Sequence, residues 1–259
     1  MVEVNLESTL DVPGFLATCG APETSDRYKF ISTQHLVERM HEHGYRPRQA
    51  FHSRSRIHNP LYTRHCVRFS KHARELNQET PEIVMFNSHD GKSSALFTSG
   101  IFRLVCSNGM VICSEQYDSF RIPHRGYKAG KPYINHVISQ VTNNLDRGME
   151  TMYKWKSLSL PLYHLRKQFY KEAMNTRFPS HLPEELATFD MPQRNEDAQL
   201  DMWTTFNRVQ EYIMNGGFTV THTEGKKPRI SRELTSVDKL QKVNENLWKV
   251  TEEFVGANW

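Results

Sequence analysis

The longest regular pattern of apolar residues in the chain covers residues 133–155. Its apolar positions recur at the three- and four-residue spacing of one helix face: Ile134, Val137, Ile138, Val141, Leu145, Met149 and Met152. A broad apolar stripe on one side of a helix has to be covered by another element. The pattern therefore predicts a long amphipathic helix that lies on a sheet.

Upstream of this helix, short apolar or alternating segments predict strands, because such runs are bounded by turn residues and are too short for helices. At Asn108-Gly109 the sequence predicts a type I′ hairpin, since both central positions of that turn need positive φ. The predicted strands cover residues 47–53, 64–70, 82–87, 95–107, 110–114 and 119–123.

The remaining periodic segments predict further helices. The first is capped by Ser32 or Thr33 and stops at Gly44, and the later ones cover residues 163–178, 198–214 and a final segment after Thr235. This order of elements, with one helix first, then strands and then further helices, favours an α+β fold with a mainly antiparallel sheet and a hairpin. The long amphipathic helix and the C-terminal helices would pack on it. The predicted parts are an irregular segment 1–31, an α+β core 32–156 and a helical part 157–259.

Composition excludes several classes of protein. The chain has 259 residues, of which 37% are hydrophobic and 24% are charged, an ordinary balance for a globular protein. No apolar run approaches the roughly 20 residues that span a bilayer. The first residues, MVEVNLESTL, lack the basic and apolar regions of a secretory signal. The four cysteines form no CxxC pair. We therefore expect a cytoplasmic protein with reduced thiols and no membrane partner.

The short motifs of common enzymes are missing. The sequence contains no HExxH, no GxxxxGK[ST] and no GxSxG. A metal-dependent nuclease would have to use His89, Asp90 and His124, although such a site needs several carboxylates converging on Mg²⁺. We predict a protein without catalytic residues, metal or cofactor, and keep the nuclease as a third alternative.

The distribution of charge along the chain is more informative about binding partners than the formal net charge of +4. Residues 45–74 carry eight Arg or Lys residues and residues 120–134 carry four, with no acid in either stretch, whereas residues 184–201 are rich in Asp and Glu. Segregated positive charge is typical of proteins that bind a phosphate backbone. The alternative interpretation is a solvated face that the acidic segment neutralises.

Aromatic residues accompany the basic ones, and base stacking combined with phosphate pairing is typical of single-strand binding. Phe51, Phe69 and Phe120 are also explained as core residues. We predict possible base stacking by Tyr45, Tyr62 and Tyr127. The predicted phosphate-binding residues are Arg46, Arg48, Arg54, Arg56, Arg64, Arg68, Lys92, Arg121, Arg125, Lys128 and Lys131.

Two long segments carry a resemblance to a known family. NSHDGKSSALFTSGIFRLVCSNGMVI at residues 87–112 and FRIPHRG at residues 120–126 resemble the signature of a phage- and plasmid-borne family catalogued as domain of unknown function nine-three-two. The later MWTTFNRVQEYIMNGG and NENLWKV fit the same pattern, so the resemblance extends from Gln34 to the C-terminus. It implies a mobile-element protein in a bacterial cytoplasm and supplies no catalytic residues.

The order of elements is similar to the core of the Rad-type single-strand annealing proteins. A helix ending at Gly44-Tyr45, basic strands, a hairpin and a long amphipathic helix follow one another, and HGYRPRQAF echoes their helix-to-strand junction. This resemblance implies a ring-shaped homo-oligomer with a basic groove for single-stranded DNA.

The leading hypothesis is a non-enzymatic nucleic-acid-binding protein of a phage or plasmid. It would bind or anneal single-stranded DNA in recombination or replication and form a homo-oligomer. The alternative is a counter-defence protein that inhibits a host defence complex by protein contact, through the acidic segment 184–201 and exposed Met and Trp residues of the later helices.

Overall fold

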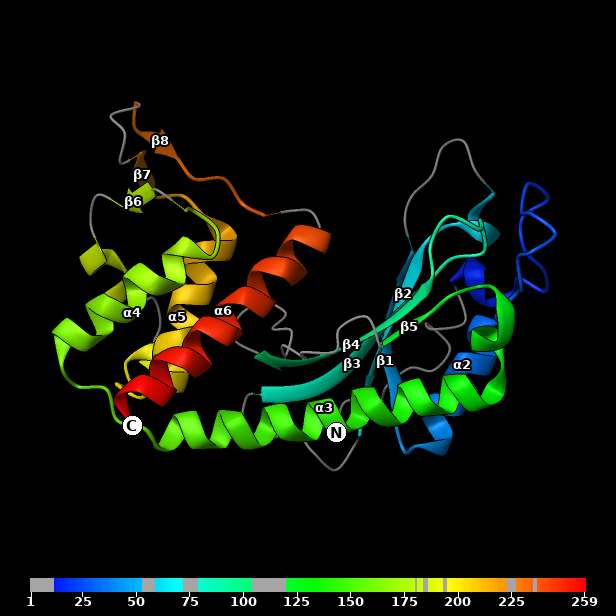
Figure 1. Cartoon of the computed structure of the whole chain (residues 1–259), viewed down its shortest axis with the longest axis horizontal. Helices are drawn as coiled ribbons and strands as arrows, with labels where there is room; N and C mark the ends of the chain where they lie inside the picture. Colours follow the sequence, from blue (N-terminus) through cyan, green and yellow to red (C-terminus); the bar gives the residue numbers. More distant parts are fainter. Residues whose placement is uncertain are drawn as a thin grey trace. The chain divides into compact units, whose positions relative to one another are not determined.

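The computed structural model describes residues 12–52, 59–71, 79–103, 120–179, 181–183, 186–192, 195–222, 227–234 and 237–259. The chain folds as two compact units (Figure 1). Among the described residues, those up to Arg147 form the first unit and those from Gly148 onwards form the second. Each unit has its own core and is described by itself.

The first unit is built on an antiparallel meander in the strand order β1-β2-β3-β4-β5. Side chains alternate across it: Val67, Phe69, Ile83 and Met85 are all fully buried, whereas Val84 and Phe86, which their apolar character marks as core candidates, are only half-buried on the other face. The predicted hairpin at Asn108-Gly109 lies outside the described residues. The strands are β1 (Arg46–His52), β2 (His65–Ser70), β3 (Glu79–Asn87), β4 (Ala95–Arg103) and β5 (Arg121–Ile122).

Helix α2 (Thr33–Glu42) precedes the sheet and begins where a capping residue was predicted. The hydroxyl of Ser32 accepts a hydrogen bond from the main-chain N–H of His35 at 3.3 Å, which satisfies one of the free donors of the first turn. Leu36 and Met40 are fully buried. Gly44, at φ +80°, turns the chain into β1 in a conformation that other residues rarely adopt.

The long amphipathic helix is confirmed as α3 (Lys131–Ser157), and the boundary between the units falls within it. In the first unit its apolar stripe is buried: Ile134, Val137, Ile138 and Val141 are at most 2% exposed. The side-chain amide of Asn144 donates to the hydroxyl of Ser99 on β4 at 2.8 Å. The helix therefore packs on the sheet as predicted, and Figure 1 shows it running alongside the strands.

The second unit packs three helices, α4 (Tyr163–Asn175), α5 (Met202–Asn215) and α6 (Val237–Asn258), with the last turns of α3. Trp155 of α3 lies at its centre, with ring-centroid distances of 4.5 Å to Trp248 and 5.4 Å to Phe206. Fully burying one large apolar side chain is worth about 2 kcal/mol, so this aromatic cluster is a main source of the unit's stability.

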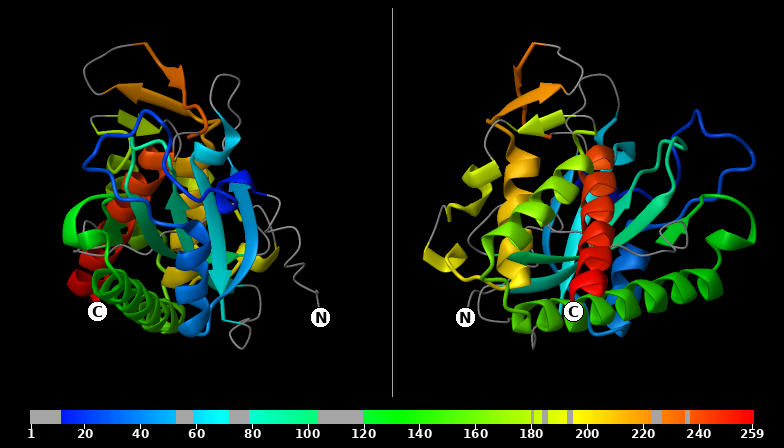
Figure 2. Two further views of the ribbon diagram at one scale, coloured as in Figure 1. Left: turned by 90° about the vertical axis from the view of Figure 1, so that its right-hand side faces the viewer. Right: turned by 60° about the vertical axis from the view of Figure 1, so that its left-hand side comes forward.

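A small antiparallel sheet was not predicted. It joins β6 (His181–Pro183), β7 (Thr219–His222) and β8 (Arg229–Ile230), three segments to which the sequence pattern assigned neither strand nor helix. Figure 2 shows it at one end of the helices of the second unit. The overall α+β class with an antiparallel sheet is confirmed. Among the described residues, no helix combines the length and the apolar character needed to cross a membrane.

Candidate functional site

A buried polar network joins the end of strand β3 to the N-terminal segment of the first unit. Asn87, which is 1% exposed, is its centre. Its amide nitrogen donates to the carbonyl oxygen of Ile31 at 3.2 Å and to the hydroxyl of Thr33 at 2.9 Å. Its amide oxygen accepts from the main-chain N–H of Ser88 at 3.0 Å. One side chain thus fixes the strand end to the residues that precede and begin helix α2.

Two histidines of this network are held as neutral rings. Nδ1 of His65 lies 2.9 Å from the carbonyl oxygen of Thr63, and a carbonyl oxygen only accepts, so Nδ1 carries the hydrogen. Its Nε2 then accepts from the hydroxyl of Thr33 at 2.7 Å. By the same reasoning Nε2 of His89, 3.0 Å from the carbonyl oxygen of Gly14, carries the hydrogen of that ring. Burial lowers the pKa of both rings, and that of His89 falls to about 4.

The N-terminal segment approaches these rings so closely that one position requires glycine. A Cβ added at Gly14 would lie 2.3 Å from Nδ1 of His65. Nδ1 of His89 is buried and has no hydrogen-bond partner among the described residues. A second proton on that ring would therefore be buried without an acceptor, which explains in physical terms why burial lowers its pKa.

A solvent-facing cavity of about 290 Å³ lies beside this network and is called the basic pocket below. Its lining combines three cationic side chains with serine hydroxyls, and no carboxylate contributes to it. Asp90 is close by, but one of its oxygens already accepts from the hydroxyl of Ser88 at 2.9 Å and the main-chain N–H of Lys92 at 3.0 Å. The lining residues are Ser25, Arg27, Tyr28, Gly91, Lys92, Ser93, Ser94, Pro123, His124 and Arg125.

Two stacked rings form the wall between the basic pocket and the network. Tyr28 and His124 lie with centroids 5.0 Å apart and planes 9° apart. Burial and the nearby charge of Asp90 raise the pKa of Tyr28 to about 12, and its hydroxyl has no partner among the described residues. Nδ1 of His124 lies 3.1 Å from the carbonyl oxygen of Lys29, and Nε2 lies 3.0 Å from the amide oxygen of Asn87.

This arrangement at His124 is unusual because both ring nitrogens face oxygen acceptors. A neutral imidazole donates through one nitrogen only, whereas the protonated ring donates through both. Burial lowers the pKa of His124, so the desolvation of the ring opposes the protonation that its two contacts favour. An anion in the basic pocket would shift this balance toward the protonated ring.

Comparisons with known proteins assign the chain to a family. The family model described as "Domain of unknown function (DUF932)" matches residues 23–248. This chain belongs to the DUF932 family. It is 31% identical over 248 residues to UPF0380 protein YafZ of Escherichia coli (strain K12), covering 93% of this chain and 87% of that protein. It is 30% identical, with the same coverage, to UPF0380 protein YfjQ of the same organism. No solved structure matches the chain.

The family match includes every residue that lines the basic pocket. Of the predicted phosphate-binding residues, this DUF932 protein brings Lys92 and Arg125 together there. Sequence reasoning missed Arg27 and Tyr28 because they lie in a segment without periodicity, and only the tertiary fold carries them to the loop after β3. Arg121 on β5 and Lys131 at the start of α3 are exposed, and Lys128 lies 5.5 Å from the ring centroid of Tyr133.

Several arginines of the predicted strands, which were predicted to bind phosphate, contact other side chains of the protein, although their own stretch of sequence contains no acid. Glu82 of β3 is 3% exposed and lies 2.5 Å from Nε of Arg68 and 3.6 Å from a terminal nitrogen of Arg48. Burial raises the pKa of Glu82, and Arg68 opposes that rise. Arg64 lies 5.0 Å from the ring centroid of Phe86, and Arg46 is exposed on β1. Arg54 and Arg56 lie outside the described residues.

The three residues predicted to stack on bases also lie in different environments. Tyr45 is 1% exposed, with the Lys71 ammonium 4.7 Å from its ring centroid, so it belongs to the core and cannot stack on a base. Tyr62 is half-buried in the short helix η2 (Pro60–Tyr62). The side chain of Tyr127 lies outside the described ones.

The residues of the nuclease alternative do not converge as a metal site. Within the part of the chain that the structure describes, no three His, Cys, Asp or Glu side chains are placed to hold a metal ion. His89 uses Nε2 on the carbonyl oxygen of Gly14, and Asp90 is engaged by Ser88 and Lys92. In the acidic segment of the counter-defence alternative, Asp190 is already paired with Arg166 at 2.6 Å.

Proposed function

We propose that this DUF932 protein binds nucleic acid, with single-stranded DNA favoured, and that phosphate groups of the strand enter the basic pocket. The observation that carries the proposal is the lining of that pocket, where Arg27, Lys92 and Arg125 meet without a carboxylate among the lining residues. Cationic side chains placed in this way replace the counterions of a phosphate backbone, and the released ions favour binding.

The chemistry of the lining suits a phosphodiester. Arg125 offers a planar fork of N–H donors that matches two phosphate oxygens, and Lys92 offers a mobile ammonium. The hydroxyls of Ser25 and Ser94 add neutral donors, whereas the hydroxyl of Ser93 already donates to Ser88. Positive φ at Gly91, +73°, forms the turn that places Lys92 at the pocket.

Preference for a single strand follows from the stacked rings at the pocket wall. Tyr28 is half-buried, so part of its ring surface remains accessible beside the cations. An unpaired base can leave its neighbours and lie against such a ring, whereas a paired base in a duplex cannot. The exposed arginines Arg46 and Arg121 would extend the phosphate path away from the pocket. We place this activity in recombination or replication of a phage or plasmid, carried out by a homo-oligomer.

The test is fluorescence anisotropy with a labelled single-stranded oligonucleotide, with the matching duplex as a second probe. The variant Lys92→Gln/Arg125→Gln removes two pocket cations, both exposed, and should weaken single-strand binding by at least about tenfold. The control Lys167→Gln/Lys171→Gln removes the same charge from exposed positions on α4 and should bind like the wild type. Equal affinity of both variants would refute the assignment of the pocket, and tighter binding of the duplex would refute the preference.

A further inference from the structure

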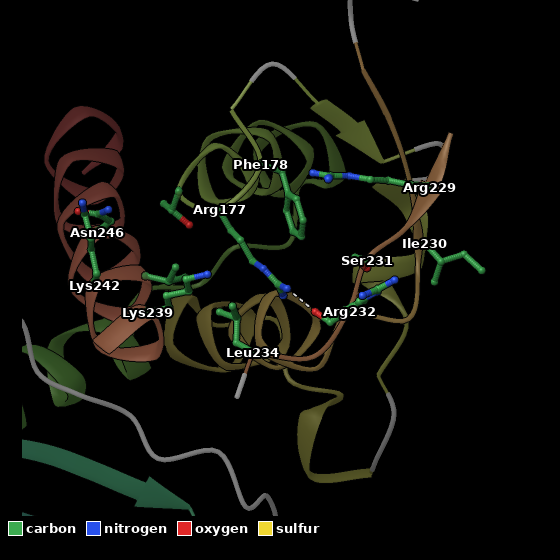
Figure 3. Close-up of a pocket in the computed structure, with 12 residues that line it drawn as sticks. Arg177, Phe178, Arg229, Ile230, Ser231, Arg232, Leu234, Lys239, Lys242 and Asn246 are labelled. Atoms are coloured by element: carbon green, nitrogen blue, oxygen red, sulfur yellow. Dashed lines mark hydrogen bonds between the residues drawn. The ribbon is translucent and has the colours of Figure 1, made fainter. Parts of the chain in front are cut away.

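A second basic cavity lies within the second unit, and it shares no lining residue with the basic pocket of the first unit. It has a volume of about 580 Å³ and is enclosed by the C-terminal end of α4, strand β8 with the residues that follow it, and the first turns of α6 (Figure 3). Cavities of this size are typical of small-molecule sites. It is called the α4–α6 pocket below.

The lining of the α4–α6 pocket carries five cations and no carboxylate: Arg177, Arg229, Arg232, Lys239 and Lys242. In Figure 3, Arg177 crosses the space from α4 towards the main chain at Arg232, Lys239 points into the same space, and Ile230 points away from it. Among the described residues, no acidic side chain forms an ion pair with any of these five cations.

Arg177 is the fixed element of the pocket. Its guanidinium donates to the carbonyl oxygens of Ile213 and Arg232, and its Cζ lies 4.7 Å from the ring centroid of Phe178. These neutral contacts hold the group in place without supplying a counter-charge. Burial and the nearby charge of Arg229 lower the pKa of Arg177. A half-buried guanidinium close to another cation is stabilised when an anion binds, because charges in a concave, partly desolvated site are poorly screened.

The neutral groups of the lining narrow the choice of anion. The hydroxyl of Ser231 already donates to the carbonyl oxygen of Phe218 at 2.9 Å, and that of Thr176 donates to the carbonyl oxygen of Ala173 at 2.7 Å. The ring of Phe178 is 5% exposed, so it offers almost no face for stacking. Among the neutral polar groups of the lining, the amide of Asn246 remains exposed, so recognition depends mainly on the five cations, and the ligand needs several negative charges close together.

We propose that the α4–α6 pocket binds linked phosphate groups, two or more in one molecule. Linked phosphates carry several negative charges within the span of the pocket, and their oxygens match the forks of Arg177, Arg229 and Arg232. Such groups come either from a free polyphosphate compound or from consecutive phosphates of a nucleic-acid strand. The site is independent of the basic pocket of the first unit, so either assignment can fail without the other.

The experiment is a calorimetric titration of the full-length protein with inorganic tripolyphosphate. The variant Arg229→Gln/Lys239→Gln changes two exposed lining residues and should bind tripolyphosphate at least about tenfold more weakly than the wild type. The control Lys167→Gln/Lys171→Gln, which removes the same charge from α4, should keep the wild-type affinity. Absence of tripolyphosphate binding to the wild type, or equal weakening in both variants, would overturn the proposal.

A second titration, with the labelled single-stranded oligonucleotide, distinguishes the two sources of phosphate. If the natural ligand is a free polyphosphate, Arg229→Gln/Lys239→Gln keeps the wild-type affinity for the labelled strand while tripolyphosphate binding falls. If the pocket continues the path of a strand, both affinities fall and tripolyphosphate competes with the strand. Loss of strand binding alone, with tripolyphosphate affinity unchanged, would contradict a phosphate site in this pocket. Equal melting temperatures of the two double variants exclude unfolding as the cause.

Discussion

Acidification should destabilise the first unit through its buried histidines, and His89 makes the largest predicted contribution. Its ring is fully buried, its Nε2–H donates to the carbonyl oxygen of Gly14, and its Nδ1 has no partner in the described part of the chain. A proton added to Nδ1 in the folded state would meet no acceptor. The unfolded chain has no such restriction, because its ring is in water and takes up the proton near the ordinary pKa.

The magnitude follows from the two pKa values. Burial lowers the pKa of His89 from 6.5 to about 4, and the difference corresponds to about 3–4 kcal/mol of unfolding free energy at about 1.4 kcal/mol per pKa unit. Because the folded pKa is the lower one, this stability is fully present above pH 6.5 and is lost as the pH falls towards 4. His65 and His124, whose pKa values burial also lowers, act in the same direction.

Urea unfolding followed by circular dichroism at several pH values between 6.5 and 4 measures this loss. The variant His89→Gln keeps an N–H donor for Gly14 and removes the titrating group, so its stability should depend less steeply on pH, by up to about 1.4 kcal/mol per pH unit. The control His41→Gln changes an exposed histidine of α2 and should keep the wild-type pH dependence. Identical pH dependence of wild type and His89→Gln would refute the reasoning.

Three further substitutions test particular contacts. Gly216→Ala should lower the melting temperature of the second unit, because φ there is +67° and a Cβ would lie 2.8 Å from the main chain at Arg232. The control Gly256→Ala, where the added Cβ would lie in open space on α6, should leave the melting temperature unchanged. Asp190→Asn should cost about 3 kcal/mol in urea unfolding, since it leaves the nearly buried guanidinium of Arg166 without a counter-charge. Glu82→Gln removes the carboxylate between two strand arginines and should raise oligonucleotide affinity in anisotropy titrations.

Each of these predictions has a contradicting result. Tryptophan fluorescence reports the second unit, since all four Trp residues lie there, and equal melting of the two glycine variants would refute the strain argument. Wild-type stability of Asp190→Asn would show that Arg166 does not depend on that charge. Unchanged strand affinity of Glu82→Gln would restrict phosphate contacts to the basic pocket.

Much of the fold was predictable because its signals are local. The apolar stripe of α3 repeats over more than five turns, and the cap at Ser32 together with Gly44 fixes both ends of α2. The small sheet of the second unit was not predictable, because strands of two to four residues carry no measurable alternation.

The candidate site was predictable only in part, because its geometry depends on contacts between distant residues. The motif around Lys92 and the segment with Arg125 stood out by charge, but Arg27 reaches them only through the folding of the N-terminal segment over Asn87. The neutralisation of Arg68 depends on the pairing of β2 with β3, which brings Glu82 beside it. Charge counted along the sequence could not reveal that pairing.

The proposed function rests on the pairing of cations in the basic pocket with phosphates of a nucleic-acid strand. The salt dependence of oligonucleotide affinity, measured for the wild type and for Lys92→Gln/Arg125→Gln, tests this pairing. We predict a log–log slope that is smaller by about 1.4 in the variant, at about 0.7 for each single-strand phosphate that the variant no longer neutralises. An affinity without salt dependence in the wild type, or the same slope in both proteins, would contradict the pairing.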